Sequence, residues 1–315
     1  MIDAHHHLWN PDVREYGWLM GGQVWASDEE LARLRRPFTL AELAPLAASA
    51  GVTGTVVIQT VNDSWETHDL LAMAAGMDPY GGSVGARHTN GLILGVVGWV
   101  DLVAGDVEQA VSRLRSKPGG RLLRGVRHPL LGEPDPNWLT RSEVLAGLRE
   151  LGEARLCFDV VALPGQLEAA VGAARSVPEL SFVLDHMGGP PASTRDPAGD
   201  SARAWAGAIR DLGALSNVTC KLSGIHGASA RAEELRPFFD TVLEAFGPER
   251  LLFGSDWPVS SLTAGYGAVL ELYRELTASL TRAEQDAIFE GTARRVYGLE
   301  PQGTGDDPAA VPGSP

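Results

Sequence analysis

Apolar strand-like runs alternate with helix-like segments along most of this 315-residue chain, and no other feature constrains its fold as strongly. The predicted strands cover residues 2–8, 55–59, 92–100, 122–128, 156–162, 182–186, 218–222 and 251–256. Most of these runs are continuously apolar, as expected for strands with both faces covered. The predicted helices cover residues 40–50, 66–77, 107–114, 142–151, 166–175, 201–215, 232–246, 268–276 and 282–297.

This alternation predicts an α/β protein, a (β/α)8 TIM barrel in a single domain that spans residues 1–298. A doubly wound open sheet is the alternative. Residues 9–38 form a long aromatic and charged loop directly after the first strand, and loops of this length are more often functional lids than slack. Residues 299–315 are rich in Gly, Pro, Asp and Ala, which predicts a flexible C-terminal tail.

Composition excludes several classes of partner. The chain has 26 Lys and Arg against 40 Asp and Glu, a formal charge of -14, which argues against nucleic acid or an anionic membrane surface. No apolar run approaches the roughly 20 residues that span a bilayer. The N-terminus has no basic region followed by an apolar segment, so we expect no secretory signal. Cys157 and Cys220 lie in apolar runs, so we expect both to be small buried hydrophobic residues and not disulfide partners. Unpaired cysteines indicate a reducing compartment, which predicts a cytoplasmic protein.

The first strand carries three consecutive histidines. Alternate side chains of a strand share a face, which predicts Asp3, His5 and His7 on one face. Two imidazoles two residues apart at a strand end can reach one metal ion or one substrate oxygen together. An expression tag is the alternative, but a tag lies outside the folded pattern, whereas this triplet lies between apolar residues that fit a strand.

Polar side chains gather where the other predicted strands end, and in a (β/α)8 barrel these ends supply the catalytic groups. Seven of the eight strands end this way, in His5 and His7, Gln59, Trp99 and Asp101, Arg127 and His128, Asp185 and His186, Lys221 and Ser223, and Ser255 and Asp256. A barrel that needs only stability has no reason to place ionisable groups there. The pattern therefore predicts a reactive or ligand-binding site.

Asp256 and His186 are the strongest single candidates among these residues. Asp256 ends an apolar strand, where we expect burial to raise its pKa and to suit it to proton transfer. A loop cap or an ion pair with Arg127 is the alternative role for this carboxylate. His186 either reacts or is hydrogen-bonded into the barrel rim, and Asp185 before it is expected to support a neighbour.

Five further residues are predicted to contact the substrate. The Arg127 guanidinium can hold a carboxylate in a bidentate fork, and His128 lies beside it, although structural ion pairs are an equal alternative for both. Gln59 and Lys221 have suitable chemistry at the same strand ends. Trp257 offers an apolar wall or simple loop packing.

Five motifs in order resemble the amidohydrolase superfamily, in its amidohydrolase-2 branch of sugar-acid lactonases and 2-pyrone-4,6-dicarboxylate lactonase. They are Asp-Ala-His-His-His-Leu-Trp at 3–9, Gly-Val-Arg-His-Pro at 125–129, Leu-Asp-His-Met-Gly at 184–188, Cys-Lys-Leu-Ser-Gly at 220–224 and Phe-Gly-Ser-Asp-Trp-Pro-Val at 253–259. The resemblance covers nearly the whole chain, from residue 2 to about residue 298.

The resemblance implies four catalytic residues, which would also be the ligands of one divalent, zinc-type ion if an ion is bound: His5, His7, His186 and Asp256. Binuclear members of the superfamily use a lysine and a further histidine at the ends of the fourth and fifth strands. Here the fourth strand ends in Arg127 and His128, and the fifth contains Asp159 but no histidine. We therefore expect one metal ion or a metal-independent site, since the lactonase branch is similar to enzymes that need no metal.

The resemblance also implies a reaction, the opening of a sugar-acid lactone or a related cyclic ester. Asp256 would activate the attacking water while the histidines polarise the carbonyl, and the loop 9–38 would close over the small-molecule substrate. A metal-dependent decarboxylase of an unsaturated or aromatic acid, and a cyclic amide hydrolase, are the enzymatic alternatives on the same site. A non-catalytic binding barrel is disfavoured because the general base and its histidine partners are intact. Helices outside the barrel are compatible with a homodimer.

Overall fold

The computed structural model describes residues 1–80, 91–190, 199–224 and 231–300. Eight parallel strands lie side by side in chain order, which confirms the predicted α/β barrel and excludes a doubly wound sheet. The strands are β1 (Ile2–His6), β2 (Gly54–Ile58), β3 (Ile93–Gly98), β4 (Leu123–Arg127), β5 (Cys157–Val160), β6 (Phe182–Leu184), β7 (Val218–Leu222) and β8 (Leu251–Phe253).

The barrel closes between β1 and the segment that follows β8. Asp256 N donates to His5 O at 2.7 Å, and His7 N donates to Trp257 O at 2.7 Å. His6 and Trp257 form a parallel bridge at the same place. The first and last strands are thus joined at their C-terminal ends.

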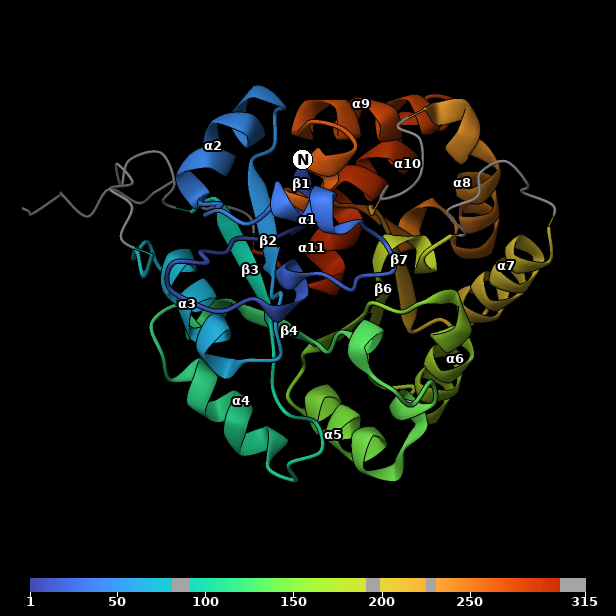
Figure 1. The fold of residues 1–315 in the computed structure, drawn as a ribbon. Helices are drawn as coiled ribbons and strands as arrows, with labels where there is room; N and C mark the ends of the chain where they lie inside the picture. Colours follow the sequence, from blue (N-terminus) through green and yellow to red (C-terminus); the bar gives the residue numbers. More distant parts are fainter. Residues whose placement is uncertain (81–90, 191–198, 225–230, 301–315) are drawn as a thin grey trace, which may run out of the picture.

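The helices form a ring outside the strands (Figure 1). They are α1 (Asp28–Ala32), α2 (Leu40–Ser49), α3 (Ser64–Ala74), α4 (Val107–Arg115), α5 (Ser142–Glu153), α6 (Leu167–Ser176), α7 (Asp200–Gly213), α8 (Ala232–Phe246), α9 (Tyr266–Leu276), α10 (Arg282–Asp286) and α11 (Thr292–Val296). The single helix predicted over residues 282–297 is interrupted, because residues 287–291 between α10 and α11 form a π-helical turn. Of these helices, α1 lies within the long loop after β1 rather than between two strands.

Apolar side chains fill two separate regions, as the alternation of strand side chains requires. The larger cluster packs the outer faces of the strands against the helices. A smaller cluster fills the barrel interior, with Ala4, Ile58, Val183 and Leu252 among its members. Leu299, the first residue of the predicted tail, is buried in this inner cluster, and residues 301–315 of that tail lie outside the described residues.

Two further expectations concern membranes and thiols. Within the described ranges, no helix combines the length and apolar character needed to cross a bilayer. Cys157 and Cys220 are both free and buried, as predicted for small hydrophobic residues.

Candidate active site

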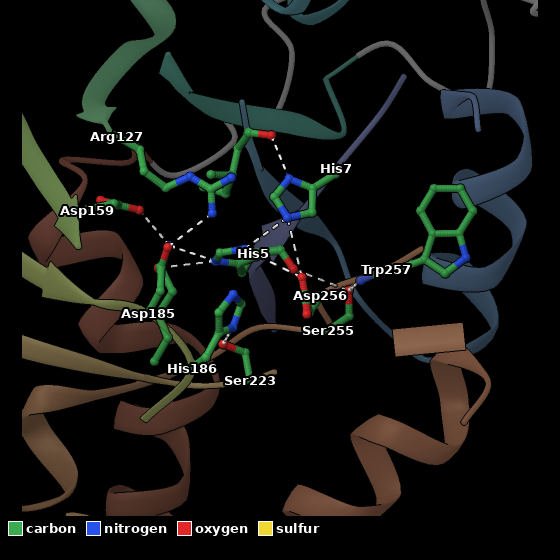
Figure 2. A network of polar contacts seen from close by, with 12 residues as sticks. His5, His7, Arg127, Asp159, Asp185, His186, Ser223, Ser255, Asp256 and Trp257 are labelled. Carbon is green, nitrogen blue, oxygen red and sulfur yellow. Dashed lines mark hydrogen bonds and ion pairs between the residues drawn. The ribbon is translucent and has the colours of Figure 1, made fainter. Parts of the chain in front are cut away.

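Five of the polar residues predicted at the strand ends lie together at the C-terminal end of the barrel (Figure 2): His5, His7, Arg127, His186 and Asp256. His5 belongs to β1 and His7 follows it, Arg127 ends β4, His186 follows β6, and Asp256 follows β8. Parallel strands bring their C-terminal ends to one rim, so residues far apart in sequence become neighbours.

A β-bulge in β1 decides which of its side chains enter the site. Between Asp3 and His6, β1 has one residue more than the matching stretch of β2. The prediction that Asp3 shares a face with His5 and His7 is therefore wrong, because the extra residue breaks the alternation. The Asp3 carboxylate instead accepts hydrogen bonds from the Ser255 hydroxyl at 2.6 Å and the Tyr266 hydroxyl at 3.0 Å. Burial raises the pKa of Asp3 to about 6, despite these donors.

His5, His7 and Asp256 form a compact group of possible ligand atoms. The Nε2 atoms of His5 and His7 lie 3.2 Å apart. Asp256 Oδ1 lies 3.3 Å from His7 Nε2 and 3.6 Å from His5 Nε2. The other ring nitrogen of His7, Nδ1, lies 2.8 Å from the carbonyl oxygen of Ile58. Because a carbonyl can only accept, His7 Nδ1 carries the proton, and its Nε2 lone pair faces the group.

Both imidazoles of this group are held neutral. Burial lowers the pKa of His5 well below its usual value, and the nearby Lys221 ammonium lowers it further. Burial also lowers the pKa of His7, against the opposing effect of its hydrogen bond to Asp256. A neutral imidazole can accept a proton or ligate a cation, so His7, whose Nε2 lone pair faces the group, keeps both options at neutral pH.

His186 lies beside this group on a different strand end. Its ring centroid is 4.5 Å from that of His5, and its Nδ1 lies 2.9 Å from the Ser223 hydroxyl. If the hydroxyl donates to Nδ1, the Nε2 atom carries the proton and can donate to a substrate oxygen.

Two of the candidate reactive residues have unusual backbone conformations. His186 and the following Met187 have φ of 55° and 53°, and Asp256 has φ of 54°. Residues other than glycine are destabilised by roughly 1–3 kcal/mol each in this left-handed region. Such residues cluster at active sites. The strain supports a functional role for both strand ends.

A buried charge network lies beneath His5. The fully buried Lys221 ammonium lies 2.6 Å from Asp159, 2.9 Å from Asp185 and 3.0 Å from His5 Nδ1. Tyr297 also donates to Asp159, at 2.8 Å. Lys221 is thus placed as a support for His5 and does not line the cavity above it.

Arg127 completes this network at the edge of the cavity. It lies 3.2 Å from Asp185 and donates to the carbonyl oxygen of Gln59. The Gln59 amide in turn donates to the Arg127 carbonyl at 2.9 Å. Burial alone would raise the pKa of Asp185, but Lys221 and His5, with Arg127, hold it well below its usual value. Asp185 therefore supports its neighbours. Arg127 lines the cavity, whereas Gln59 does not.

Two other predicted substrate contacts, His128 and Trp257, are packed away from the cavity. His128 lies 2.7 Å from Glu133 and stacks on Trp138 with ring centroids 4.0 Å apart. Trp257 is buried and packs edge-on against Phe38. Neither residue is among those lining the cavity.

A cavity of about 1110 Å³ opens above these groups. Its reactive end is formed by His7, Arg127, Asp185, His186 and Asp256. Volumes of about 300–1,000 Å³ are usual for small-molecule sites, so the cavity is ample for one small substrate.

The long loop 9–38 forms part of the cavity wall. Its ends are tied by two main-chain hydrogen bonds between Trp9 and Phe38, at 3.2 and 2.8 Å. Trp18 and Trp25 from its middle line the cavity. Arg14 connects the loop to α3 through ion pairs with Asp63 and Asp69. The loop thus covers the site, and its closing motion as a lid stays a prediction.

The donor atoms fit one divalent ion. Two groups of the described residues can converge on a cation, His5 with His7 and Asp256, or His5 with Asp185 and His186. The first group is better suited, because Asp185 is already neutralised by two cations. The hydrogen bond from His7 Nδ1 to a carbonyl is also the kind of contact that orients metal-bound histidines. A zinc-type ion therefore suits His5, His7 and Asp256.

Two contributors to this region carry no signal in the sequence. Glu66 begins the helix predicted over residues 66–77, yet it is fully buried beside the cavity segment Thr60–Asn62. Tyr297 ends the helix predicted over residues 282–297, yet it contacts Asp159 from within the inner cluster. Neither residue has a motif around it that signals these contacts.

Comparison with known proteins identifies the family of this chain. The family model described as amidohydrolase matches residues 2–299. An L-fucono-1,5-lactonase of Burkholderia multivorans is 32% identical over 308 residues, covering 95% of this chain and 96% of the relative. An L-fucono-1,5-lactonase of Burkholderia ambifaria is 32% identical, covering 84% of this chain and 83% of the relative.

A solved structure extends this likeness to the fold. The crystal structure of an amidohydrolase from Burkholderia multivorans with bound zinc has a TM-score of 0.81 and 32% identity, and the match covers 95% of this chain and 99% of that one. The sequence motifs, the barrel and the family match all cover the same nearly complete length. The chain therefore belongs to the amidohydrolase family and is a hydrolase.

Proposed function

We propose that the protein opens a lactone ring by hydrolysis, with a sugar-acid lactone as its substrate. The observation that carries this proposal is the group of one carboxylate and two neutral imidazoles, from Asp256, His5 and His7, at the reactive end of a covered cavity. The two lactonases that share 32% identity with this chain support the same class of reaction.

In this mechanism Asp256 is the general base. Its carboxylate takes a proton from a water molecule as the water oxygen forms a bond to the ring carbonyl carbon. The bond from that carbon to the ring oxygen then breaks, and Asp256 returns the proton to the leaving alkoxide. One water is consumed, and the product is an open-chain hydroxy acid.

The role of each histidine depends on which of its ring nitrogens carries the proton. His186 can donate from Nε2 to the carbonyl oxygen, where negative charge develops, because Ser223 can satisfy its Nδ1. His7 has its lone pair at Nε2, so it serves as a hydrogen-bond acceptor or as a metal ligand. When a zinc-type ion is bound by His5, His7 and Asp256, it supplies Lewis-acid polarisation of the carbonyl.

The predicted substrate contacts take two different roles in this proposal. Arg127 lines the cavity and binds a ring hydroxyl or a carboxylate. The other four act through the residues that they contact: Gln59 contacts Arg127, His128 contacts Glu133, Lys221 contacts His5, and Trp257 contacts Phe38. The homodimer and the cytoplasmic location stay predictions from the sequence.

The test is turnover of a panel of sugar-acid lactones, followed by proton release, on protein of known metal content before and after chelation. We expect turnover of at least one 1,5-lactone. Turnover that survives chelation assigns the polarising role to His186, and turnover lost with the metal and regained on zinc addition assigns it to the ion. No lactone turnover, together with release of carbon dioxide from an unsaturated or aromatic acid, would overturn the lactonase in favour of the decarboxylase.

A further inference from the structure

The segment that follows β2 joins the reactive group to the cavity wall. The last residue of β2, Ile58, accepts a hydrogen bond from His7 through its carbonyl, and the next residue, Gln59, is hydrogen-bonded to Arg127. The following residues, Thr60–Asn62, line the cavity itself. The position of Thr60–Asn62 therefore shapes the wall beside both His7 and Arg127.

Glu66 clamps this part of the wall. One carboxylate oxygen, Oε2, accepts hydrogen bonds from the main-chain N–H of Thr60 at 2.7 Å and of Val61 at 3.0 Å. The other, Oε1, accepts from the Thr60 hydroxyl at 2.5 Å. All three donors belong to the cavity segment.

The clamp is not needed to start the helix that carries it. The α3 N-cap is Asp63, whose side chain already accepts a hydrogen bond from Trp65 N at 2.8 Å. A glutamate at the third helical position usually reaches back to the main chain of the N-cap residue. Glu66 instead reaches past Asp63 to Thr60 and Val61, toward the cavity.

Burying this carboxylate is unfavourable for folding. Glu66 is fully buried, and desolvation raises its pKa to about 7 despite the three donors. The ionisable groups around it are Arg14 and Tyr16 from the loop 9–38, and Tyr80. A small apolar residue would avoid the desolvation but would leave two main-chain N–H groups beside the cavity without their acceptor.

We propose that Glu66 is a positioning residue for substrate binding, and that it fixes Thr60–Asn62 against α3 in the shape that the bound lactone requires. The proposal rests on the proposed function for its kinetic readout. The reactive groups themselves lie at the ends of β1, β6 and β8, and His7 is held by the carbonyl of Ile58 at the end of β2. Loss of the clamp therefore acts on binding rather than on the chemical step.

The kinetic test compares two substitutions of Glu66. In Glu66→Ala we expect KM to rise about tenfold, as for loss of a charged hydrogen-bond acceptor, with kcat within about twofold of the wild type. In Glu66→Gln we expect KM to return close to the wild-type value. The amide oxygen can accept from both main-chain N–H groups, and the amide nitrogen can donate to the Thr60 hydroxyl.

Asn217→Ala is the matched control for a general loss of stability. The half-buried Asn217 side chain donates to the carbonyls of Ala174, Val177 and Leu180 before the start of β7, at the opposite end of the barrel. Its removal should lower the melting temperature without raising KM. An unchanged KM in Glu66→Ala, an equal rise in Asn217→Ala, or no rescue by Glu66→Gln would overturn the proposal.

Amide hydrogen exchange tests the clamp without substrate or turnover. We expect the N–H groups of Thr60 and Val61 to be protected in the wild type and in Glu66→Gln, and to exchange at least roughly tenfold faster in Glu66→Ala. Fast exchange of both in the wild type would overturn the clamp even if Glu66→Ala does not fold. Absence of all lactone turnover would count against the proposed function, while this exchange measurement would still decide the clamp.

Discussion

His5 and Asp256 are hydrogen-bonded through the main chain, and their side chains lie close together. Asp256 N donates to His5 O at 2.7 Å, and His5 Nε2 lies 3.6 Å from Asp256 Oδ1. The main-chain pairing that closes the barrel and the candidate reactive group therefore share the same two residues. The pairing that completes the fold also brings the proposed general base to the histidines.

The histidine group should bind one zinc ion. We expect isothermal titration to show one site per chain in the wild type and to show a loss of affinity in His7→Ala. That loss should exceed the roughly 10–100-fold cost of losing an outer-shell partner, because a ligand itself is removed. The control is His128→Ala, since His128 is already held by Glu133 and Trp138 and should leave the affinity unchanged. Equal losses in both variants would refute this assignment.

Removing the buried ammonium should destabilise the fold strongly. Lys221→Met leaves Asp159 and Asp185 without the cation that lies 2.6 and 2.9 Å from them. We expect the free energy of unfolding to fall by about 3–5 kcal/mol in urea titrations, the cost of breaking a buried pair. Adding Asp159→Asn to this variant removes one of the unpaired charges and should recover part of the loss. A loss below about 1 kcal/mol, typical of exposed pairs, would argue against this role.

Glu66 should make stability depend on pH in a defined direction. Its pKa rises from 4.5 to about 7 on folding, mainly through burial. The folded state then binds the proton more tightly than the unfolded state, so this contribution to stability is complete below about pH 4.5 and is lost as pH rises through 7. The Glu66→Gln variant has no ionisable group at this position, so it lacks this contribution to the pH dependence of stability.

The free energies of unfolding of the wild type and Glu66→Gln, measured from pH 5 to pH 8, test this sign. We expect the free energy of unfolding of Glu66→Gln to increase relative to that of the wild type as pH rises, by up to roughly 3 kcal/mol at pH 8. A gap that shrinks with rising pH would show that the ionised carboxylate stabilises the fold instead.

Much of the fold could be predicted because strand and helix patterns are local. Eight apolar runs separated by helical segments leave few topologies, and parallel strands place residues such as Arg127 and Asp256 at one rim. The bulge in β1 could not be predicted, since it depends on pairing with β2 rather than on the residues Asp3 to His6 themselves. Because of this bulge, the Asp3 side chain does not lie on the predicted face.

The site could be predicted at the level of which residues approach it, but not of what each one contacts. His5, His7 and Asp256 follow from strand position alone. The burial of Lys221 below His5, and the contact of Glu66 with Thr60, depend on packing between elements that are distant in sequence or separated by a turn. A charged residue in the first turn of a helix usually faces solvent, and nothing near Glu66 in the sequence signals otherwise.

The central claim is that Asp256 is the general base for lactone opening, and its most direct test is kcat of Asp256→Asn on the best lactone of the panel. Asparagine keeps the shape and tolerates the left-handed backbone at this position, so the main-chain pairing that closes the barrel should remain intact. We expect kcat to fall by about 100-fold to 10,000-fold, with an unchanged melting temperature. The control Asp135→Asn alters an exposed carboxylate paired with Arg141 and should keep wild-type kcat. Near-wild-type turnover in Asp256→Asn would contradict the account.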